Sequence, residues 1–174
     1  MRAFPFLRCR TLRPAGALML ALVLLPAAVA CSGSSPSEPG GGSSAAVAEI
    51  RSFNLLNEAR REAGRPELIF DPAIAEVARR HSRRMRDEGF FEHIDPDGKG
   101  PAQRLSAAGI GFALVGENLA TVTTRGDAAR FAHGLLMDNA GHRANILDGR
   151  FTDVGVGVAQ DGDTYFMTQV FVRR

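Results

Sequence analysis

The chain has 174 residues, a formal net charge of +2, 23% charged residues and 45% hydrophobic residues. This composition is typical of a globular protein and excludes a disordered or fibrous chain, and the length suits one domain of ordinary size. Residues 1–30 contain four arginines and no acidic residue, which leaves a charge of −2 for residues 31–174. A slightly acidic body lacks the basic footprint of a sequence-independent nucleic-acid binder, so we expect no nucleic-acid partner.

Residues 1–30 predict an export signal. The arginines come first, and an uncharged run rich in Leu, Ala and Val follows; it is shorter than the roughly 20 apolar residues of a membrane span. The run ends in small residues before Cys31, which resembles the lipobox of bacterial lipoprotein signals and implies a lipid on that cysteine. By the same resemblance, Ser32 favours the outer membrane in a cell that has one. The alternative is ordinary cleavage near Ala30, which would give a soluble extracellular protein.

Residues 31–45 predict a flexible tether, because Ser, Gly and Pro dominate them and cannot build a core. The folded domain is expected over residues 46–174. Both cysteines of the chain, Cys9 and Cys31, lie before this domain. The domain therefore has no disulfide, no thiolate metal site and no cysteine nucleophile.

Apolar periodicity and cap residues predict a series of helices. The first should bury a stripe of apolar residues, namely Val47, Ile50, Phe53 and Leu56, widened by Leu55 and Ala59. The second should begin after Asp71, with an arginine-rich face opposite its apolar one. That arginine face could bind anionic headgroups or polysaccharide, or simply face water. The expected helices cover residues 46–63, 72–88, 101–108 and 128–139, with a further turn over 142–147.

The last part of the chain predicts a β-hairpin. Valines alternate with Gly155 and Gly157, the pair Asp161 and Gly162 should form a tight turn, and a second strand should cover residues 164–172. The two small glycines indicate that another element packs closely on the first strand. Helices followed by strands indicate an α+β layered domain with an antiparallel sheet. Residues 109–126 are expected to be a loop.

Two histidines lie at junctions where a side chain can point into a cleft, namely His93 before a turn and His142 at a helix start. Glu117 lies between them along the chain. Two imidazoles and a carboxylate are the ligands of many open zinc sites, but they could equally form a hydrogen-bonded cluster that braces the fold. His81 is expected to be a buried core histidine, because it lies on an apolar helix face. His133 is expected at the surface.

Several short motifs follow one another over residues 50–173, and together they resemble the bacterial branch of the CAP superfamily. This superfamily comprises cysteine-rich secretory, antigen-five and pathogenesis-related-one proteins, and its domain is also called the SCP-like extracellular domain. The resemblance implies a three-layer α-β-α sandwich with a central antiparallel sheet. The motifs are Leu-Leu-Asn-Glu-Ala-Arg (55–60), His-Ser (81–82), Phe-Glu-His-Ile-Asp-Pro-Asp-Gly (91–98), Gly-Glu-Asn (116–118), Gly-His-Arg-Ala-Asn-Ile-Leu (141–147) and Val-Gly-Val-Gly (154–157).

The resemblance also implies a cleft with two histidines and two glutamates, which in some members holds zinc or another divalent ion. Matched motif by motif, the histidines are His93 and His142 and the first glutamate is Glu117, and these three would be the metal ligands. The second glutamate has no clear counterpart. Asn139 falls nearest to its position and Asp138 lies beside it, which leaves a four-residue metal site in question.

The expected function is a membrane-anchored binding module for a lipid or another envelope ligand, with a cleft that holds a divalent metal. One alternative is an envelope hydrolase that uses the metal or a histidine as general base. Against it, common catalytic signatures such as His-Glu-x-x-His and Gly-x-Ser-x-Gly are absent from the sequence. The other alternative is a cluster that only stabilises the fold.

Overall fold

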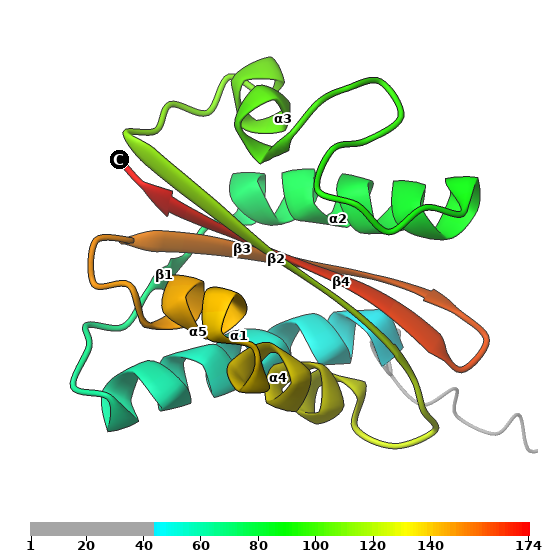
Figure 1. Cartoon of the computed structure of the whole chain (residues 1–174), viewed down its shortest axis with the longest axis horizontal. Helices are drawn as coiled ribbons and strands as arrows, with labels where there is room; N and C mark the ends of the chain where they lie inside the picture. Colours follow the sequence, from blue (N-terminus) through cyan, green and yellow to red (C-terminus); the bar gives the residue numbers. More distant parts are fainter. Residues whose placement is uncertain (1–43) are drawn as a thin grey trace, which may run out of the picture. The chain divides into compact units, whose positions relative to one another are not determined.

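The structure, a computed structural model, describes residues 44–174; the expected signal peptide, Cys31 and nearly all of the tether lie outside the described residues. In residues 44–174, no helix is both long enough and apolar enough to cross a membrane. Figure 1 shows the elements of the described part. They are α1 (Ser44–Glu62), β1 (Ile69–Phe70), α2 (Pro72–Glu88), α3 (Pro101–Ala107), β2 (Leu114–Thr123), α4 (Ala128–Asp138), α5 (Ala140–Leu147), β3 (Asp153–Asp161) and β4 (Thr164–Arg173).

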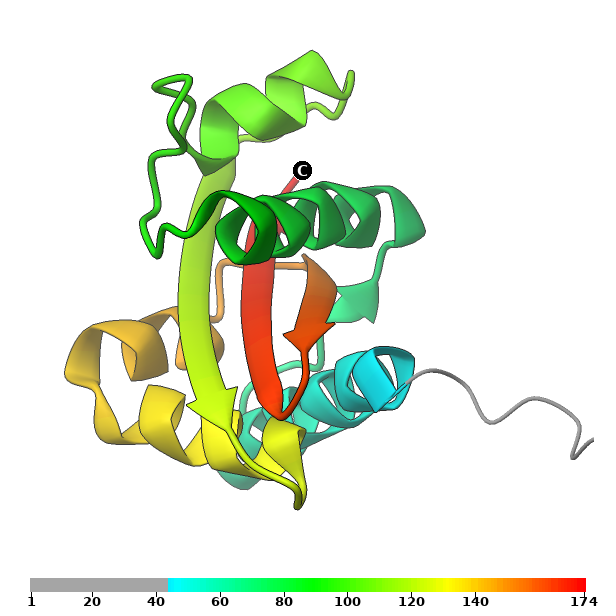
Figure 2. The same cartoon turned by 90° about the vertical axis from the view of Figure 1, so that its right-hand side faces the viewer.

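The strands form one sheet in the order β1-β3-β4-β2. The three long strands are antiparallel to their neighbours, as expected, and only the two-residue β1 runs parallel to its partner β3. Figure 2 shows β2 as the outer strand on the side opposite β1. The expectation of a loop over 109–126 is wrong for the ten residues of β2. The polar pair Glu117 and Asn118 interrupts the apolar pattern there, and both find their partners only in the folded protein.

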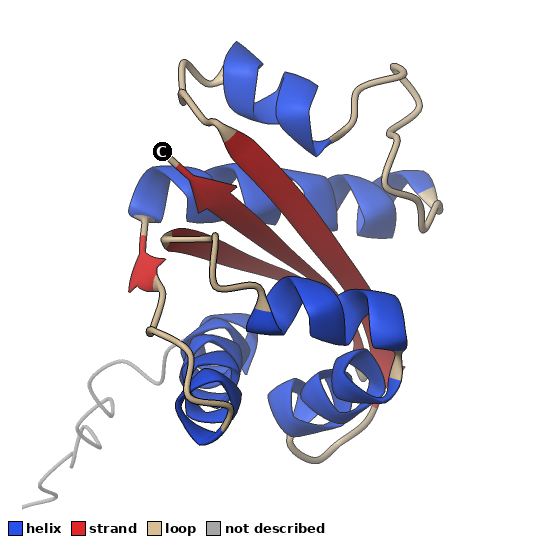
Figure 3. Ribbon diagram, turned by 60° about the vertical axis from the view of Figure 1, so that its left-hand side comes forward, coloured by secondary structure: helices blue, strands red, loops and turns tan. Residues whose placement is uncertain are grey.

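Helices cover both faces of the sheet, which confirms the three-layer sandwich (Figures 1 and 3). Helix α2 packs on β3 and β4, and α3 lies beside β2 on the same side, whereas α1, α4 and α5 lie on the other side. The sheet therefore separates two apolar clusters. One contains Leu56, Leu136 and Phe171 between the sheet and α1, α4 and α5. The other contains Ile74 and Val170 beneath α2.

Helix α2 lies unusually close to β3, as the glycines of that strand predict. A Cβ atom built on Gly155 would lie 2.2 Å from the backbone nitrogen of Ala75, and one on Gly157 would lie 2.1 Å from that of Arg79. The helix begins where expected, because the Asp71 side chain accepts hydrogen bonds from two backbone N–H groups of its first turn. The glycines thus set the distance between the sheet and the layer that carries His81.

Helix α1 is present, but it buries only part of the predicted stripe. Val47 and Ile50 are 54% and 65% exposed, whereas Glu49 on the opposite side is 7% exposed. The Glu49 carboxylate accepts hydrogen bonds from Arg79 Nε and Nη2 and one from the Val158 N–H. This buried polar contact leaves Val47 and Ile50 in solvent. The predicted Leu56 and Ala59 face the core, and so does Ala48.

Two boundaries also differ from the predictions. The hairpin turn consists of Gly162 and Asp163, because Asp161 pairs with Thr164 and Gly162 has a φ of 54°. The single turn expected at 142–147 is the longer helix α5, which Asn139 caps by accepting hydrogen bonds from the N–H groups of Gly141 and His142. Both differences leave the expected order of elements unchanged.

Candidate functional site

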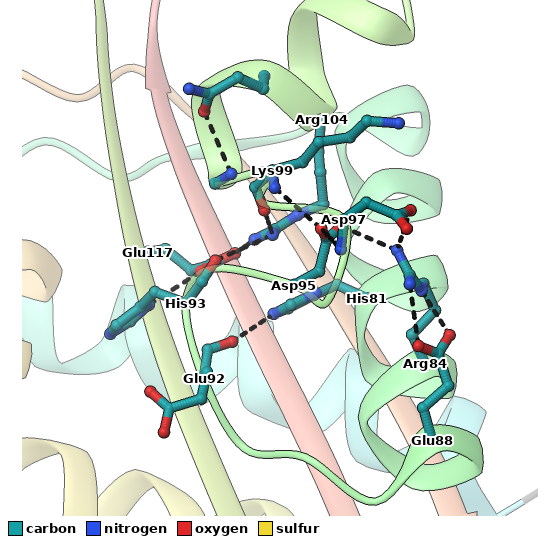
Figure 4. A network of polar contacts seen from close by, with 12 residues as sticks. His81, Arg84, Glu88, Glu92, His93, Asp95, Asp97, Lys99, Arg104 and Glu117 are labelled. Atoms are coloured by element: carbon teal, nitrogen blue, oxygen red, sulfur yellow. Dashed lines mark hydrogen bonds and ion pairs between the residues drawn. The ribbon is translucent and has the colours of Figure 1, made fainter.

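His93 and Glu117 are hydrogen-bonded to each other beside a buried ion pair of Glu117 with Arg104, as Figure 4 shows. The Nδ1 atom of His93 lies 2.9 Å from Oε1 of Glu117, and Arg104 donates from Nη2 to Oε2 at 2.6 Å. The Glu117 side chain is 2% exposed and that of Arg104 is 9% exposed, whereas that of His93 is 51% exposed. We call these three residues the His–Glu–Arg cluster. It joins the loop after α2, strand β2 and helix α3.

Arg104 is the member of this cluster that the sequence did not reveal. Besides Glu117, its Nη1 atom donates to the backbone carbonyls of His93 at 2.9 Å and Lys99 at 2.7 Å. Asp95 folds the same loop by accepting the N–H groups of Asp97 and Lys99. A buried arginine needs such acceptors, because an unpaired buried charge is strongly destabilising. Arg104 therefore fixes the loop that presents His93.

His142 lies on α5, which two asparagines attach to β2 beside Glu117. The Asn118 side chain donates to the carbonyl of His142 at 3.1 Å, and the Asn145 side chain donates to the carbonyl of Glu117 at 3.2 Å and to Asn118 Oδ1 at 2.9 Å. The sequence showed Asn118 and Asn145 only as parts of the Gly-Glu-Asn and Gly-His-Arg-Ala-Asn motifs. In the structure they hold α5 and its histidine against the strand that carries Glu117.

The two cleft histidines have opposite pKa shifts. The hydrogen bond to Glu117 raises the pKa of His93 above its ordinary value. Burial lowers the pKa of His142, and the nearby charge of His93 lowers it further. The two shifts thus favour the protonated form at His93 and the neutral form at His142.

Asp138 and Asn139 do not complete a second acidic position in the cluster. Asn139 uses its side-chain oxygen to cap α5. Asp138 is exposed at the end of α4, where it lines a cavity with Arg130 and Phe131. The structure therefore does not bring a second carboxylate to Glu117 from either of these positions.

The expected three-ligand metal set does not fit the arrangement of Glu117. Both of its carboxylate oxygens are engaged, one by His93 and one by Arg104. Among residues 44–174, no group of three His, Cys, Asp or Glu side chains is placed to hold a metal ion. Since His93 uses Nδ1 for Glu117, its Nε2 is the nitrogen left to bind an ion, and His142 would be the second donor. Glu117 would then orient a ligand, as carboxylates commonly do for metal-binding histidines.

Two cavities lie along the outer edge of β2 next to His142. The smaller, of about 210 Å³, is lined by Leu119 and Thr121 of β2, by Phe91, and by His142 and Leu135 from the other side. The larger, of about 490 Å³, continues past Thr121 and Leu135 to residues 122–124 and the start of α4. Because the two cavities share Thr121 and Leu135, we treat them as one feature and call it the edge groove.

The other two histidines lie away from the cleft. His81 is 1% exposed, its Nε2 lies 3.0 Å from the carbonyl of Glu92, and burial lowers its pKa, which confirms a core histidine. The expectation of a surface position for His133 is wrong. His133 is half-buried, burial lowers its pKa, and the nearest charges are Glu58 and Glu62 of α1. Packing of α4 on α1, which sequence periodicity does not specify, accounts for this.

The arginine face of α2 is largely neutralised by acidic neighbours. Arg79 pairs with Glu49, Arg83 with Glu76, and Arg84 with Glu88 and Asp95. These pairs favour the interpretation of a solvated, internally balanced face over a binding surface for anionic lipid or polysaccharide.

A three-layer sandwich whose cleft joins a loop histidine, a strand glutamate and a helix histidine defines the class of domain. The model of the family "CAP: Cysteine-rich secretory protein family" matches residues 53–172, and the chain belongs to this family. It is 32% identical over 130 residues to the uncharacterized protein YkwD of Bacillus subtilis, and 33% identical over 128 residues to the uncharacterized membrane protein YlbC of the same organism. These matches cover 75% and 74% of this chain but only 49% and 35% of those relatives.

Solved structures agree with this assignment. An extracellular protein of Bacillus anthracis with an SCP domain is 36% identical, with a TM-score of 0.66 over 74% of this chain and 41% of that one. An outer surface protein of Borrelia burgdorferi has a TM-score of 0.67 over 74% of this chain and 93% of that one. At 16% identity, the second likeness shows the fold alone.

Proposed function

We propose that this chain is an exported, lipid-anchored binding protein whose cleft takes up a component of the cell envelope. Its membership of a family with extracellular relatives supports export. The signal-like residues 1–30, Cys31 and the tether support a lipid anchor and thus a location at the envelope. The cleft comprises the His–Glu–Arg cluster, His142 and the edge groove.

The observation that carries this proposal is the difference between the two parts of the cleft. In the cluster, Glu117 is fully engaged by His93 and Arg104, so it braces the cleft and is not a free acid or base. In the edge groove, Phe131 and Leu135 are each 58% exposed and Phe91 is 43% exposed. Exposed apolar side chains around a cavity are typical of a binding site.

One observation favours a second candidate, a hydrolase. The Glu117 carboxylate orients the His93 imidazole, which resembles the carboxylate–histidine pair of general-base catalysis. His93 Nε2 would take a proton from an attacking water. The raised pKa of His93 opposes this role, because a protonated imidazole cannot accept that proton. Hydrolysis of peptide or ester substrates by the purified protein, abolished in His93→Ala, would establish this activity in place of simple binding.

A divalent ion, zinc or another, is part of the same proposal. The imidazoles of His93 and His142 are the donors that would hold it, with Glu117 orienting His93. When bound, such an ion would offer an electrophilic centre to an oxygen-rich ligand. Without the ion, the hydrogen bond to Glu117 still orients His93. The bond from Asn118 to the His142 carbonyl still holds α5 against β2.

The binding proposal is tested by cosedimentation of the purified protein with isolated cell-envelope fragments. Leu135→Asp places a charge in the edge groove, and we expect it to reduce the bound fraction at least fivefold. Ile69→Asp is the matched control, because Ile69 is similarly apolar and 67% exposed but lies on β1 at the opposite edge of the sheet. Equal binding by both variants and the wild type would contradict the proposal.

A further inference from the structure

Strand β2 carries unpaired backbone groups along the edge groove. The Thr124 N–H donates to the Asp163 carbonyl at 2.8 Å, in register with the antiparallel pairing of β2 and β4. Since hydrogen-bonding direction alternates along a strand, the N–H and C=O groups of Leu119 and Thr121 point away from β4. In the part of the chain that the structure describes, nothing hydrogen-bonds to these outward groups.

This edge also lacks the usual protection. Natural proteins shield exposed strand edges with charged residues, proline, bulges or a covering element, because such edges recruit other strands. Residues 118–123 are Asn-Leu-Ala-Thr-Val-Thr, without charge or proline. The carbonyl of Glu117 is already taken by Asn145. Asn118 and Leu119 are buried, at 0% and 5% exposed, so the accessible stretch of this edge begins at Thr121. It carries the outward N–H and C=O groups of Thr121 and Thr123, which are both exposed.

The groove has an apolar wall on each side of the sheet edge. Phe91 lines it from the loop that also carries His93, and Leu135 lines it from α4. Figure 2 shows β2 between the α2–α3 side and the α4–α5 side of the sandwich. An added strand would place alternate side chains against the two walls.

Two ionic groups at the groove indicate the charge of its occupant. Arg130 and Asp138 both line the larger cavity, and within residues 44–174 neither forms an ion pair. They lie eight residues apart on α4, or about 12 Å along the helix. Arg130 adjoins the turn after Thr123, whereas Asp138 lies toward Leu119. An extended segment with an acidic side chain at one end and a basic one at the other would complement them.

We propose that the edge groove binds an extended polypeptide segment as an added strand on β2, with an acidic side chain toward Arg130. This inference rests on the proposed function and names the chemical class of the envelope ligand. A lipid chain could cover the apolar walls, but it could not pair with the outward N–H and C=O groups of Thr121 and Thr123. An added strand would cover the apolar walls and also pair with the outward backbone groups, as in other domains that bind peptides at a sheet edge.

The decisive comparison is between two variants of Thr121, of which one lacks the outward backbone N–H group and the other keeps it. Thr121→Pro removes the outward N–H without removing a hydrogen bond to β4, and an edge strand tolerates proline there. Thr121→Val keeps the N–H and the branched shape. The probes are labelled heptapeptides of alternating Val and Thr flanked by Glu and Lys, in both orders, and binding is followed by fluorescence anisotropy. We expect Thr121→Pro to weaken binding about tenfold and Thr121→Val less than about twofold.

A measurement on the wild type avoids any effect of proline on folding. The same peptide with N-methyl groups on alternate residues cannot pair as a strand, and we expect it to bind at least about tenfold more weakly. The unmodified peptide should slow hydrogen exchange of the Thr121 and Thr123 amides. Equal binding of the methylated peptide, or no binding of either order at about 1 mM, would overturn strand addition.

The competing occupants give distinct results. Binding of phosphatidylglycerol vesicles that Leu135→Asp abolishes, without peptide binding, would indicate a lipid ligand and overturn strand addition while leaving the proposed binding function intact. Protection of the Thr121 and Thr123 amides by increasing protein concentration alone would indicate a second copy and overturn the peptide proposal. If the wild type binds neither the envelope fragments nor the peptides, both proposals are contradicted.

Discussion

Arg104 and Glu117 form a buried ion pair across the cleft, with Nη2 of Arg104 2.6 Å from Oε2 of Glu117. The same guanidinium holds the loop around His93 by two backbone carbonyls. One pair of charges thus determines where α3, β2 and the His93 loop lie relative to one another. The position of the candidate site depends on it.

Glu117→Gln should lower the free energy of unfolding by about 3 kcal/mol, because it leaves the Arg104 charge buried without a counter-ion. Chemical denaturation of the wild type and of Glu117→Gln at pH 7 measures this difference in free energy. Glu67→Gln is the control, since its 3.0 Å pair with Arg61 is half-exposed and should contribute less than about 1 kcal/mol. Similar small losses in both variants would show that the buried pair does not stabilise the cleft.

His93 should stabilise the fold more in acid than in alkali. Its pKa is raised in the folded protein by Glu117, so its stabilising effect is complete below the unfolded value of about 6.5 and is lost as pH rises through the folded value. Unfolding free energies of chelator-treated wild type and His93→Gln should therefore differ more at low pH than at high pH. A difference that grows with pH would contradict the hydrogen bond to Glu117.

His142 should show the opposite pH dependence. Burial lowers its pKa in the folded protein, so the unfolded chain binds the proton more readily and wild type loses stability relative to His142→Gln as pH falls below about 6.5. Proton NMR titration of the two imidazoles measures the order of their pKa values directly. We expect His93 to titrate at a higher pH than His142.

Gly155→Ala should destabilise the domain by about 3 kcal/mol, because its Cβ would meet the α2 backbone at 2.2 Å and the helix would have to move. Gly134→Ala is the matched control. Gly134 lies within α4, and a methyl group there would have no neighbouring atom within 4 Å, so alanine should stabilise by about 0.5–1 kcal/mol. Thermal denaturation of both variants measures the contrast. A tolerated Gly155→Ala would mean that α2 and β3 are farther apart.

Calorimetric titration with zinc tests the metal part of the proposal. We expect the double variant His93→Ala and His142→Ala to bind zinc about tenfold or more weakly than the wild type. Asp138→Ala serves as control, since Asp138 is exposed away from the cluster. Equal binding by the double variant and the wild type would remove these histidines from any metal site.

The lipid anchor is tested separately in cells. Cys31→Ser should move the protein from the membrane fraction to the soluble extracytoplasmic fraction, because the anchor depends on that cysteine. Cys9→Ser should have no such effect, since Cys9 precedes the expected cleavage site. A signal-cleaved Cys31→Ser protein that stays with the membrane would contradict lipidation.

The sequence predicted most of the fold because its helices carry strong local signals. The cap at Asp71, the glycines of β3 and the alternation of β4 all correspond to what the structure shows. Strand β2 was missed because Glu117 and Asn118 break its apolar pattern. The first turns of α1 were misjudged, because the contact of Glu49 with Arg79, thirty residues away, leaves Val47 and Ile50 exposed.

The site was predictable only in part for a similar reason. His93, Glu117 and His142 were recognisable from junctions and from the family motifs. Arg104 lies in a short helix with no motif of its own, and its role comes from carbonyls and a carboxylate that folding brings to it. The edge groove was not predictable, because it depends on β2 being the outer strand and on the placement of α4 beside it.

The most direct test of the central claim is an amide NMR map of the protein with and without solubilised envelope fragments. We expect shifts to concentrate at Phe91, at residues 119–123 of β2, and at Leu135 and His142. Shifts confined to β1, at the opposite edge of the sheet, and to the exposed side of α1 would contradict a binding cleft at the His–Glu–Arg cluster and the edge groove.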